Sequence, residues 1–444
     1  MNSKLKMNDS LVVGFALFAM FFGAGNLIFP PDIGIRGGTT WALGYIFYFI
    51  ADVGLAVMGV FAMLKSQGSL EKMGSSIGKI PAVMMNTAVI LCIGPCLAIP
   101  RTAAAVFELG VLPITGIDAS NTKIPLAIFS IIFFAIVLIL TIRPSKVIDI
   151  VGKILTPLLL ITLVVLIITG ILNPLSSVDT EATEPMVKYG LYNGYQTMDA
   201  FASIFFINII ITTFKNKGYT EGKQIYMVTV KATVIAGLLL FLVYGGLSYL
   251  GASTGSHWTQ DVLNGTMNQA ALLINITHAL LGKAGIIVLG LIAAFACLTT
   301  AIGLTSATAE YFEELSGGKL SYTLITIITC VFSAFICNLG LSQIISISAP
   351  ILVILYPVMI MLMITAIMRS FIPIIWAFRV AVLVTFIVSI ISTLCDMFGF
   401  KQFNWVHELP LDSYGFNWVV PALTAFLLSA IVLVVTKSTD KKLA

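Results

Sequence analysis

The chain of 444 residues has few charged side chains, because Asp, Glu, Lys and Arg make up only 10% of it. Soluble globular proteins carry about 25%. With 59% hydrophobic residues and a mean hydropathy of +1.04, this shortage of charge excludes a soluble domain. It indicates an integral membrane protein whose main surroundings are a lipid bilayer. No basic stretch suits nucleic acid, so we expect no nucleic-acid partner, and no feature calls for an obligate protein partner.

Histidine and cysteine are also scarce. His257, His278 and His407 are scattered over connections between apolar runs, so they imply neither a metal site nor a catalytic base. The six cysteines lie in or beside apolar runs without paired metal-ligand spacing, and we interpret them as small buried residues. No small-x-small cleavage motif follows Lys4 and Lys6, which favours a first helix that is retained.

Groupings of catalytic residues are missing as well. A polytopic membrane enzyme would need paired carboxylates, a nucleophile with its base, or clustered histidines at the membrane boundary. The one dense acidic group, Glu310, Glu313 and Glu314, has no such companion and suits a solvated helix end. A channel is disfavoured because no filter motif repeats along the chain. We therefore expect a protein that is not an enzyme, with a membrane enzyme as a remote alternative.

Long apolar runs are what the chain has in abundance. Runs of about 18–25 residues cross the hydrocarbon core of a bilayer. They predict twelve transmembrane helices near residues 11–30, 41–64, 82–107, 125–142, 152–172, 190–214, 225–250, 284–311, 321–337, 344–368, 372–395 and 417–436. Basic residues gather in alternate connections, such as the one with Lys65, Lys72 and Lys79, and cytoplasmic connections carry this excess. We expect both termini in the cytoplasm.

The spacing of these runs is consistent with an internal repeat, because runs 2, 3 and 4 recur as runs 7, 8 and 9 at similar intervals. Five crossings are an odd number, so a second set of five must run in the opposite direction. Inverted repeats with interrupted helices are typical of secondary transporters that bind substrate near the membrane midplane. We predict one all-α transmembrane transporter domain over residues 1–444, with a first repeat at 11–172, an inverted repeat at 190–368 and two extra helices at 372–436.

The first run is interrupted by residues that a simple membrane helix would avoid. Gly23, Gly25 and Asn26 are followed by Pro30 and Pro31. Relative to alanine, glycine costs about 1 kcal/mol and proline about 3 kcal/mol in a helix interior. A glycine-lined packing face would account for neither Asn26 nor the prolines. The stretch predicts a broken helix whose bare backbone groups hold a ligand or an ion, inside protein or beside a hydrated cavity.

The sixth run is the expected partner of the first and is interrupted too. It places Gly194, Gln196, Thr197 and Asp199 at membrane depth. An intramembrane carboxylate costs about 2.5–3.5 kcal/mol on insertion scales, which makes Asp199 a candidate functional group. Asp199 could also cap the second half of a broken helix, and the two roles are compatible.

The eighth run supplies candidate ion ligands. Ala296, Thr299 and Thr300 fall on one face of a helix with 3.6 residues per turn, so one carbonyl and two hydroxyls share that face. Neutral oxygen ligands suit a monovalent cation better than a divalent one. The competing interpretation is that each hydroxyl bonds back to a carbonyl of its own helix.

Two further charged residues lie inside apolar runs. Asp52, midway along the second run, is either a protonatable group or the partner of a neighbouring helix. Pro100, Arg101 and Thr102 mark a position in the third run where we expect a kink that faces a vestibule. Arg101 could guide a carboxylate or act as a gate, and it could equally pair with Glu108 or extend towards water.

Four motifs resemble those of the branched-chain amino acid:cation symporters, over nearly the whole chain. They are Phe-Phe-Gly-Ala-Gly-Asn-Leu-Ile-Phe-Pro-Pro (21–31), Ala-Ile-Pro-Arg-Thr-Ala (98–103), Gly-Tyr-Gln-Thr-Met-Asp-Ala (194–200) and Ala-Cys-Leu-Thr-Thr-Ala-Ile-Gly (296–303). The resemblance implies import of leucine, isoleucine and valine with Na⁺ across a bacterial plasma membrane. A proton-coupled or exchange-type amino-acid carrier is the alternative. The resemblance also implies a LeuT-type fold of five plus five inverted helices, with helices 1 and 6 broken and two helices added at the C-terminus.

The resemblance also implies positions for a sodium site. Its ligands would be the backbone carbonyls of Ala19, Phe22 and Ala296 and the hydroxyls of Thr299 and Thr300. H⁺ remains open as the coupling ion, because Asp52 departs from the pattern expected for the second helix.

The substrate is expected to meet both broken helices. Backbone amides around Gly23, Ala24 and Gly25 would receive its carboxylate. Its ammonium would be received by Thr197 and Asp199, or by carbonyls freed at the break of the sixth run. The residues expected around it are Phe22, Gly23, Ala24, Gly25, Asn26, Thr197, Met198, Asp199 and Phe201. Phe21 and Phe205 are further candidates for the apolar pocket that would hold its side chain.

Overall fold

The computed structural model describes residues 7–117, 121–142, 151–216, 218–219, 222–369, 371–372 and 374–443. Across these residues the chain is helical, without a strand. They contain nine helical stretches long and apolar enough to cross a membrane, with three shorter apolar helices at Asp9–Phe21, Tyr322–Cys337 and Val419–Val432. The all-α membrane class is confirmed, whereas the count of twelve helices stays a prediction. Lys4 and Lys6 lie outside the described residues.

Most connections between the helical elements are short, and a longer one spans residues 173–185. In chain order they are α1 (Met7–Phe21), α2 (Ala24–Gly37), η1 (Gly38–Thr40), α3 (Trp41–Phe49), η2 (Ile50–Gly54), α4 (Leu55–Lys65), α5 (Leu70–Gly74), α6 (Lys79–Leu91), η3 (Cys92–Cys96), α7 (Ala98–Val106), η4 (Phe107–Val111), α8 (Leu112–Thr115), α9 (Lys123–Thr141), η7 (Val151–Leu155), α11 (Thr156–Leu172), α12 (Met186–Thr197), α13 (Asp199–Asn216), α14 (Gly222–Ala252), α15 (Gly255–Leu263), α16 (Gln269–Leu315), α17 (Tyr322–Cys337), α18 (Leu341–Met368), α19 (Ile375–Phe398), η8 (Lys401–His407), η9 (Asp412–Tyr414) and α20 (Val419–Leu443).

These elements form two compact units. The larger unit contains Met1–Val57 and Ile90–Ser346, and the smaller contains Met58–Val89 and Ile347–Ala444. Within the smaller unit α19 packs along α20, and the ring centroids of Phe378 and Phe426 are 4.8 Å apart. The expected single transporter domain with its repeat boundaries stays a prediction.

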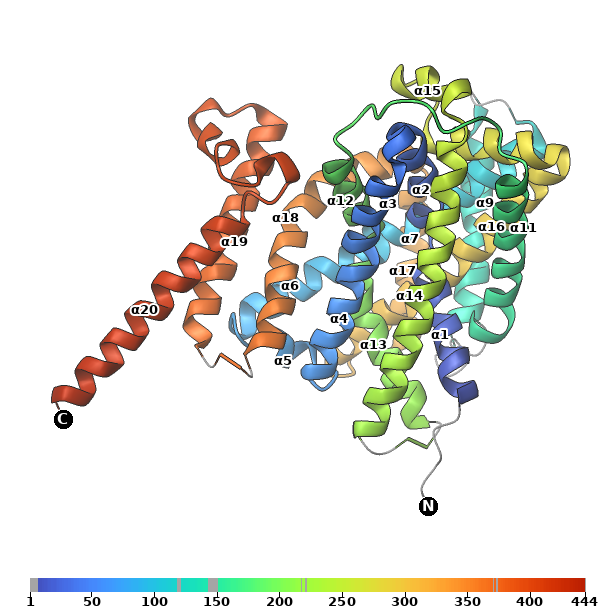
Figure 1. Ribbon diagram of the computed structural model, residues 1–444. Coiled ribbons are helices and arrows are strands. Elements are labelled where there is room, and N and C mark those ends of the chain that lie inside the picture. Colours follow the sequence, from blue (N-terminus) through green and yellow to red (C-terminus); the bar gives the residue numbers. More distant parts are fainter. Residues whose placement is uncertain are drawn as a thin grey trace. The chain divides into compact units, whose positions relative to one another are not determined.

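In the larger unit, α14 packs against both α1 and α2, and α12 packs against α3 (Figure 1). Glycine allows the closest of these approaches. A Cβ atom on Gly34 would lie 1.9 Å from the carbonyl oxygen of Ser248, and one on Gly251 would lie 1.9 Å from that of Pro31. Small residues let membrane helices touch through their backbones. Gly34 and Gly251, which lie just beyond the first and seventh runs, therefore serve helix packing.

The third run is broken, but not where its prolines led us to expect. Gly94, followed by Pro95, leaves the helical region with ψ −128° inside the π-helical turn η3, and α7 starts at Ala98. Pro100 lies in the first turn of α7, where proline is tolerated because the N–H it lacks has no acceptor in the helix. The kink expected at Pro100–Thr102 is therefore wrong in position, and Arg101 belongs to a new half-helix.

The contact between α2 and α14 gives a test of the fold. We expect Gly34→Ala to lower the free energy of unfolding by at least about 2 kcal/mol, because its methyl group overlaps the backbone of α14. Thermal unfolding of purified protein in detergent measures the change. Gly237→Ala is the matched control, since its Cβ would lie 3.7 Å from Val53, an ordinary contact on the same α14. Equal melting temperatures for the two variants would contradict this packing.

Candidate functional site

The first apolar run is broken between α1 and α2. Gly23 is extended, with φ −110° and ψ −160°, and its N–H donates to the side-chain oxygen of Asn26 at 3.2 Å. The next N–H groups lie in the first turn of α2, where they have no acceptor within the helix. Pro30 and Pro31 lie inside α2. The break predicted from the sequence is confirmed, and Gly23 rather than the prolines makes it.

The sixth run is broken at a single residue. Met198 adopts a left-handed conformation, with φ 69° and ψ 13°, between the end of α12 and Asp199 at the start of α13. A residue other than glycine in this region costs roughly 1–3 kcal/mol, and such strain is concentrated at functional sites. The predicted interruption is confirmed. It frees the last carbonyls of α12 and sets Asp199 where a helix N-terminus favours negative charge.

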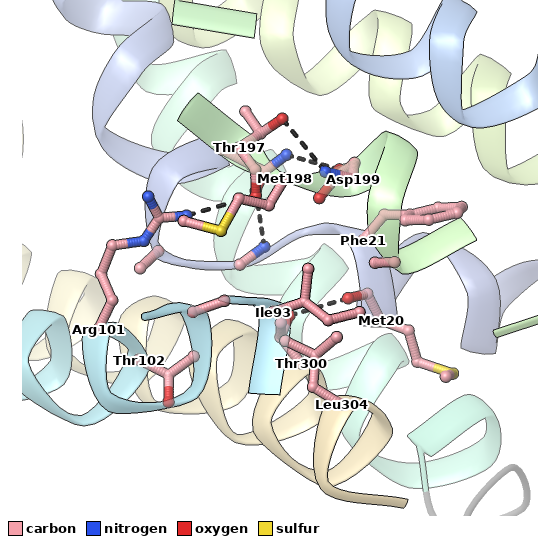
Figure 2. Close-up of a pocket in the computed structure, with 15 residues that line it drawn as sticks. Met20, Phe21, Ile93, Arg101, Thr102, Thr197, Met198, Asp199, Thr300 and Leu304 are labelled. Carbon is pink, nitrogen blue, oxygen red and sulfur yellow. Dashed lines mark hydrogen bonds between the residues drawn. The ribbon is translucent and has the colours of Figure 1, made fainter. Parts of the chain in front are cut away.

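The breaks of the first, third and sixth runs all border one small cavity (Figure 2). Its volume is about 20 Å³, which is room for about one water molecule. The lining residues are Met20, Phe21, Gly23, Ala24, Asn26, Ile93, Ala98, Arg101, Thr102, Thr197, Met198, Asp199, Ala202, Thr300 and Leu304. Six of the residues expected around a substrate are among them: Gly23, Ala24, Asn26, Thr197, Met198 and Asp199.

Several aromatic residues expected at the site lie elsewhere. Phe22 stacks on Phe18 with ring centroids 5.6 Å apart. Phe205 packs against Tyr311, and Phe201 is fully buried outside the cavity lining.

The apolar wall is made instead by Phe21, by residues of the third run and by small or aliphatic residues of other helices. The members not predicted from the sequence are Met20, Ile93, Ala98, Ala202 and Leu304. The orientation of each helix about its own axis decides which side chains form this wall. The sequence of an apolar run gives almost no information about that orientation.

The predicted ion ligands of α1 and α16 converge. The Thr299 hydroxyl has one hydrogen to donate and two acceptors within reach, the carbonyls of Ala19 (2.7 Å) and Ala296 (2.8 Å). The Thr300 hydroxyl likewise has the carbonyls of Met20 (3.0 Å) and Ala19 (3.4 Å) as acceptors. The bond to a carbonyl of its own helix is observed for Thr299, whereas the bonds given for Thr300 are to α1; the ion site itself stays a prediction. Met20 was not predicted, and the hydrogen bonds found among the described residues do not bring the Phe22 carbonyl to this group.

A second polar group surrounds Asn26. Its side-chain nitrogen lies 2.9 Å from Oδ2 of Asp199, 3.2 Å from Oδ2 of Asp52 and 2.6 Å from the Tyr244 hydroxyl. The Thr197 hydroxyl donates to Oδ1 of Asp52 at 2.9 Å. An amide nitrogen has two hydrogens, so these three acceptors compete for two donors. Tyr244, which comes from α14, was not predicted from the sequence.

Two local features bring Asp52 to this group. Asp52 lies in the π-helical turn η2, and such turns occur frequently at functional sites. Gly194 of α12 packs directly on this turn, because a Cβ atom there would lie 2.6 Å from Cβ of Ala51. Asp52 is fully buried, and its carboxylate shares the Asn26 side-chain nitrogen with that of Asp199. Of the two interpretations from the sequence, pairing with a neighbouring helix is therefore observed.

Arg101 is buried and turned towards α12, so it does not extend to water. Its side chain is 3% exposed. Nη1 donates to the Gln196 carbonyl at 2.7 Å and Nη2 to the Thr197 carbonyl at 3.3 Å. The carboxylate of Glu108 accepts from the backbone N–H of Leu341 at 3.2 Å. Arg101 thereby satisfies carbonyls that the break at Met198 leaves open.

Comparison with known sequences shows what the chain is similar to. A family model described as branched-chain amino acid transport protein matches residues 6–436. The chain is 36% identical to the branched-chain amino acid permease BrnQ of Escherichia coli (strain K12), over 97% of both chains. It is 37% identical to a protein of Staphylococcus aureus (strain USA300) named as a branched-chain amino acid carrier, over 96% of both chains.

Comparison with solved structures concerns the fold alone. A nucleobase-cation-symport-1 family transporter, closed with bromovinylhydantoin bound, superposes with a TM-score of 0.61 at 13% identity, over 95% of this chain and 93% of that one. MhsT in complex with L-phenylalanine superposes with a TM-score of 0.51 at 17% identity, over 94% and 98%. The likeness confirms the expected LeuT-type fold.

The hydrogen bonds around Asn26 can be tested by replacing its side-chain amide nitrogen with an oxygen. Asn26→Asp replaces the donor shared by two buried carboxyl groups with a third carboxyl group. We expect a loss of about 3–5 kcal/mol in the free energy of unfolding, as for other uncompensated buried charges. Thermal unfolding in detergent measures it. Asn338→Asp makes the same change at an exposed helix end and should shift stability far less; similar losses in the two variants would contradict the proposed arrangement.

Proposed function

The chain belongs to the branched-chain amino acid transport protein family, and from this membership we propose that it imports leucine, isoleucine and valine together with Na⁺. It is a transporter rather than an enzyme. The observation that carries the proposal is the cavity at which three broken helices meet, because broken helices at membrane depth are where secondary transporters bind substrate and coupling ion. Alternating access would expose this cavity to each side of the membrane in turn.

The two ends of an amino acid match the two kinds of helix end at the cavity. The first turn of α2 offers N–H groups at the positive end of a helix dipole, which suits a carboxylate. The last turn of α12 offers carbonyls, and Asp199 follows directly, which suits an ammonium group. Met20, Ile93 and Leu304 line the cavity with apolar surface for a branched aliphatic side chain.

Na⁺ would bind at the contact between α1 and α16. The carbonyls of Ala19 and Ala296 and the hydroxyls of Thr299 and Thr300 are neutral oxygen ligands within one group. A hydroxyl that donates its hydrogen to a carbonyl keeps lone pairs for a cation. Binding there would join α1 to α16 and lower the free energy of the conformation in which they touch. The ion would thereby influence the neighbouring substrate cavity, which Thr300 also lines.

Proton coupling is the second candidate, and one specific observation favours it. Asp52 and Asp199 are both buried and share a single amide donor. Two carboxylates in such a site repel one another, and a proton bound between them removes the repulsion. The pair would then carry the proton.

The cellular location follows from the family and the charge pattern. We propose a bacterial plasma membrane protein with both termini in the cytoplasm, because the connections rich in lysine and arginine then lie inside. Cysteine accessibility in intact cells would test the orientation at exposed loop positions.

The sodium proposal predicts the behaviour of the threonine variants. Replacing Na⁺ by choline at fixed pH should reduce leucine uptake into proteoliposomes to background. Thr299→Ala and Thr300→Ala should each raise the Na⁺ concentration for half-maximal uptake about tenfold, because each removes an oxygen ligand worth about 1–3 kcal/mol. The KM for leucine at saturating Na⁺ should change less.

The control for this experiment is Thr308→Ala. Thr308 is buried in the same α16, but its hydroxyl donates to the Leu304 carbonyl of its own helix. Its Na⁺ activation should match the wild type. Undiminished uptake in choline would overturn sodium coupling. Unchanged Na⁺ activation in folded Thr299→Ala and Thr300→Ala proteins would show that Na⁺ binds at another site.

A further experiment distinguishes coupling to Na⁺ from coupling to H⁺. We expect a Na⁺ gradient, and not a pH gradient alone, to drive leucine accumulation, and we expect Asp52→Asn to keep this dependence while uptake falls. The reason is that the ligands proposed for Na⁺ do not include Asp52. Accumulation driven by a pH gradient alone in the wild type, and lost in Asp52→Asn, would replace sodium coupling with proton coupling.

A further inference from the structure

Arg101 is the one cationic side chain among the described residues that line the cavity, and Asp199 is the one carboxylate there. Burying a guanidinium is expensive unless it is paired. Arg101 is 3% exposed. Its terminal nitrogens donate to the carbonyls of Gln196 and Thr197, and its charge interacts with the carboxylate of Asp199. Figure 2 shows the side chain reaching from α7 across to the end of α12.

The same guanidinium lies beside the start of α2. Its Nη2 is 3.1 Å from the position that a Cβ atom on Gly25 would take. Arg101 therefore stands between two helix ends, with the carbonyls of α12 on one side and the first turn of α2 on the other. A carboxylate bound at the first turn of α2 would be within reach of a small swing of this long side chain.

The small volume of the cavity means that lining groups must move before an amino acid can enter. A cavity of about 20 Å³ holds about one water molecule, so a branched-chain amino acid enters only when lining groups move aside. A swing of Arg101 away from α12 would leave the carbonyls of Gln196 and Thr197 without their donor. The ammonium group of the substrate can replace it, because it also brings positive charge and N–H donors to that helix end.

We propose that Arg101 binds the carboxylate of the transported amino acid and, in doing so, releases the Gln196 and Thr197 carbonyls to its ammonium group. The inference rests on the proposed substrate class and adds a residue to the site. A guanidinium–carboxylate pair is roughly twice as strong as a neutral hydrogen bond and is frequently bidentate. A zwitterion supplies both new partners at once. An amine without a carboxylate leaves Arg101 with no new acceptor, so Arg101 selects for zwitterions.

The test compares leucine with isoamylamine, which is leucine without its carboxylate. Binding to purified protein in saturating Na⁺ is measured for the wild type, Arg101→Gln, Arg101→Lys and Arg379→Gln. Arg379 is the matched control, since its guanidinium also donates to a backbone carbonyl, that of Ser76, within the smaller unit. Size-exclusion profiles and melting temperatures establish that each variant is folded.

We expect the wild type to bind leucine at least 100-fold more tightly than isoamylamine. Arg101→Gln should weaken leucine binding about 100-fold and isoamylamine binding less than threefold, so that the preference collapses. Arg101→Lys keeps the positive charge but loses the two parallel N–H donors of the guanidinium, so it should weaken leucine binding about tenfold and leave isoamylamine binding unchanged. Arg379→Gln should stay within twofold of the wild type for both ligands.

Three outcomes would count against the assignment. Equal weakening of leucine and isoamylamine would show that Arg101 only supports the end of α12. Unchanged leucine affinity in Arg101→Gln would remove it from the site. If Arg101→Gln does not fold, the ratio of leucine affinity to isoamylamine affinity in Arg101→Lys tests the assignment instead. A wild-type protein that binds no branched-chain amino acid would overturn the proposed function itself, and the inference with it.

Discussion

The site depends on one constraint, which is that every backbone polar group at membrane depth must find a partner within the protein. Three helix breaks lie at the cavity, at Gly23, Gly94 and Met198. Their free ends are satisfied largely by side chains of other segments. Arg101 of α7 donates to the end of α12, and Thr300 of α16 donates to the end of α1. The ends of α1 and α12 therefore depend on side chains from other helices.

The same constraint accounts for the gathering of ionisable residues here. Asp52, Asp199 and Arg101 are buried within the layer of the breaks, and Asn26 connects the two acids to the backbone of Gly23. Polar groups in a medium of low dielectric interact strongly, so a network of this kind fixes one arrangement when its members are satisfied. A ligand that brings its own charges can change which partners are satisfied, which gives a buried site the means to respond to what it binds.

The sequence predicted the breaks of the first and sixth runs, because glycine weakens a helix and because asparagine and aspartate are costly at membrane depth unless they serve a site. It failed in the third run, where Pro100 suggested a kink that Gly94 makes, since proline fits the first turn of a helix and interrupts only its interior. The apolar wall of the cavity, which includes Ile93 and Leu304, could not be predicted. In a uniformly apolar helix the sequence does not show which side faces the cavity. The meeting of Asp52 with Asn26 depends on the close approach of Gly194 to Ala51, which local sequence does not encode.

The break at Gly23 also separates two opposite charges over a very short distance. Before it, α1 ends in the carbonyls of Ala19 and Met20, the negative end of a helix dipole, and Thr299 and Thr300 add hydroxyl oxygens. After it, α2 begins with N–H groups at a positive end, next to Arg101. Each helix end carries roughly half an elementary charge. A cation on one side and a carboxylate on the other would each lower the free energy of the same extended residue. In the proposed symport this shared backbone geometry couples the two binding events, so that neither ligand needs to touch the other.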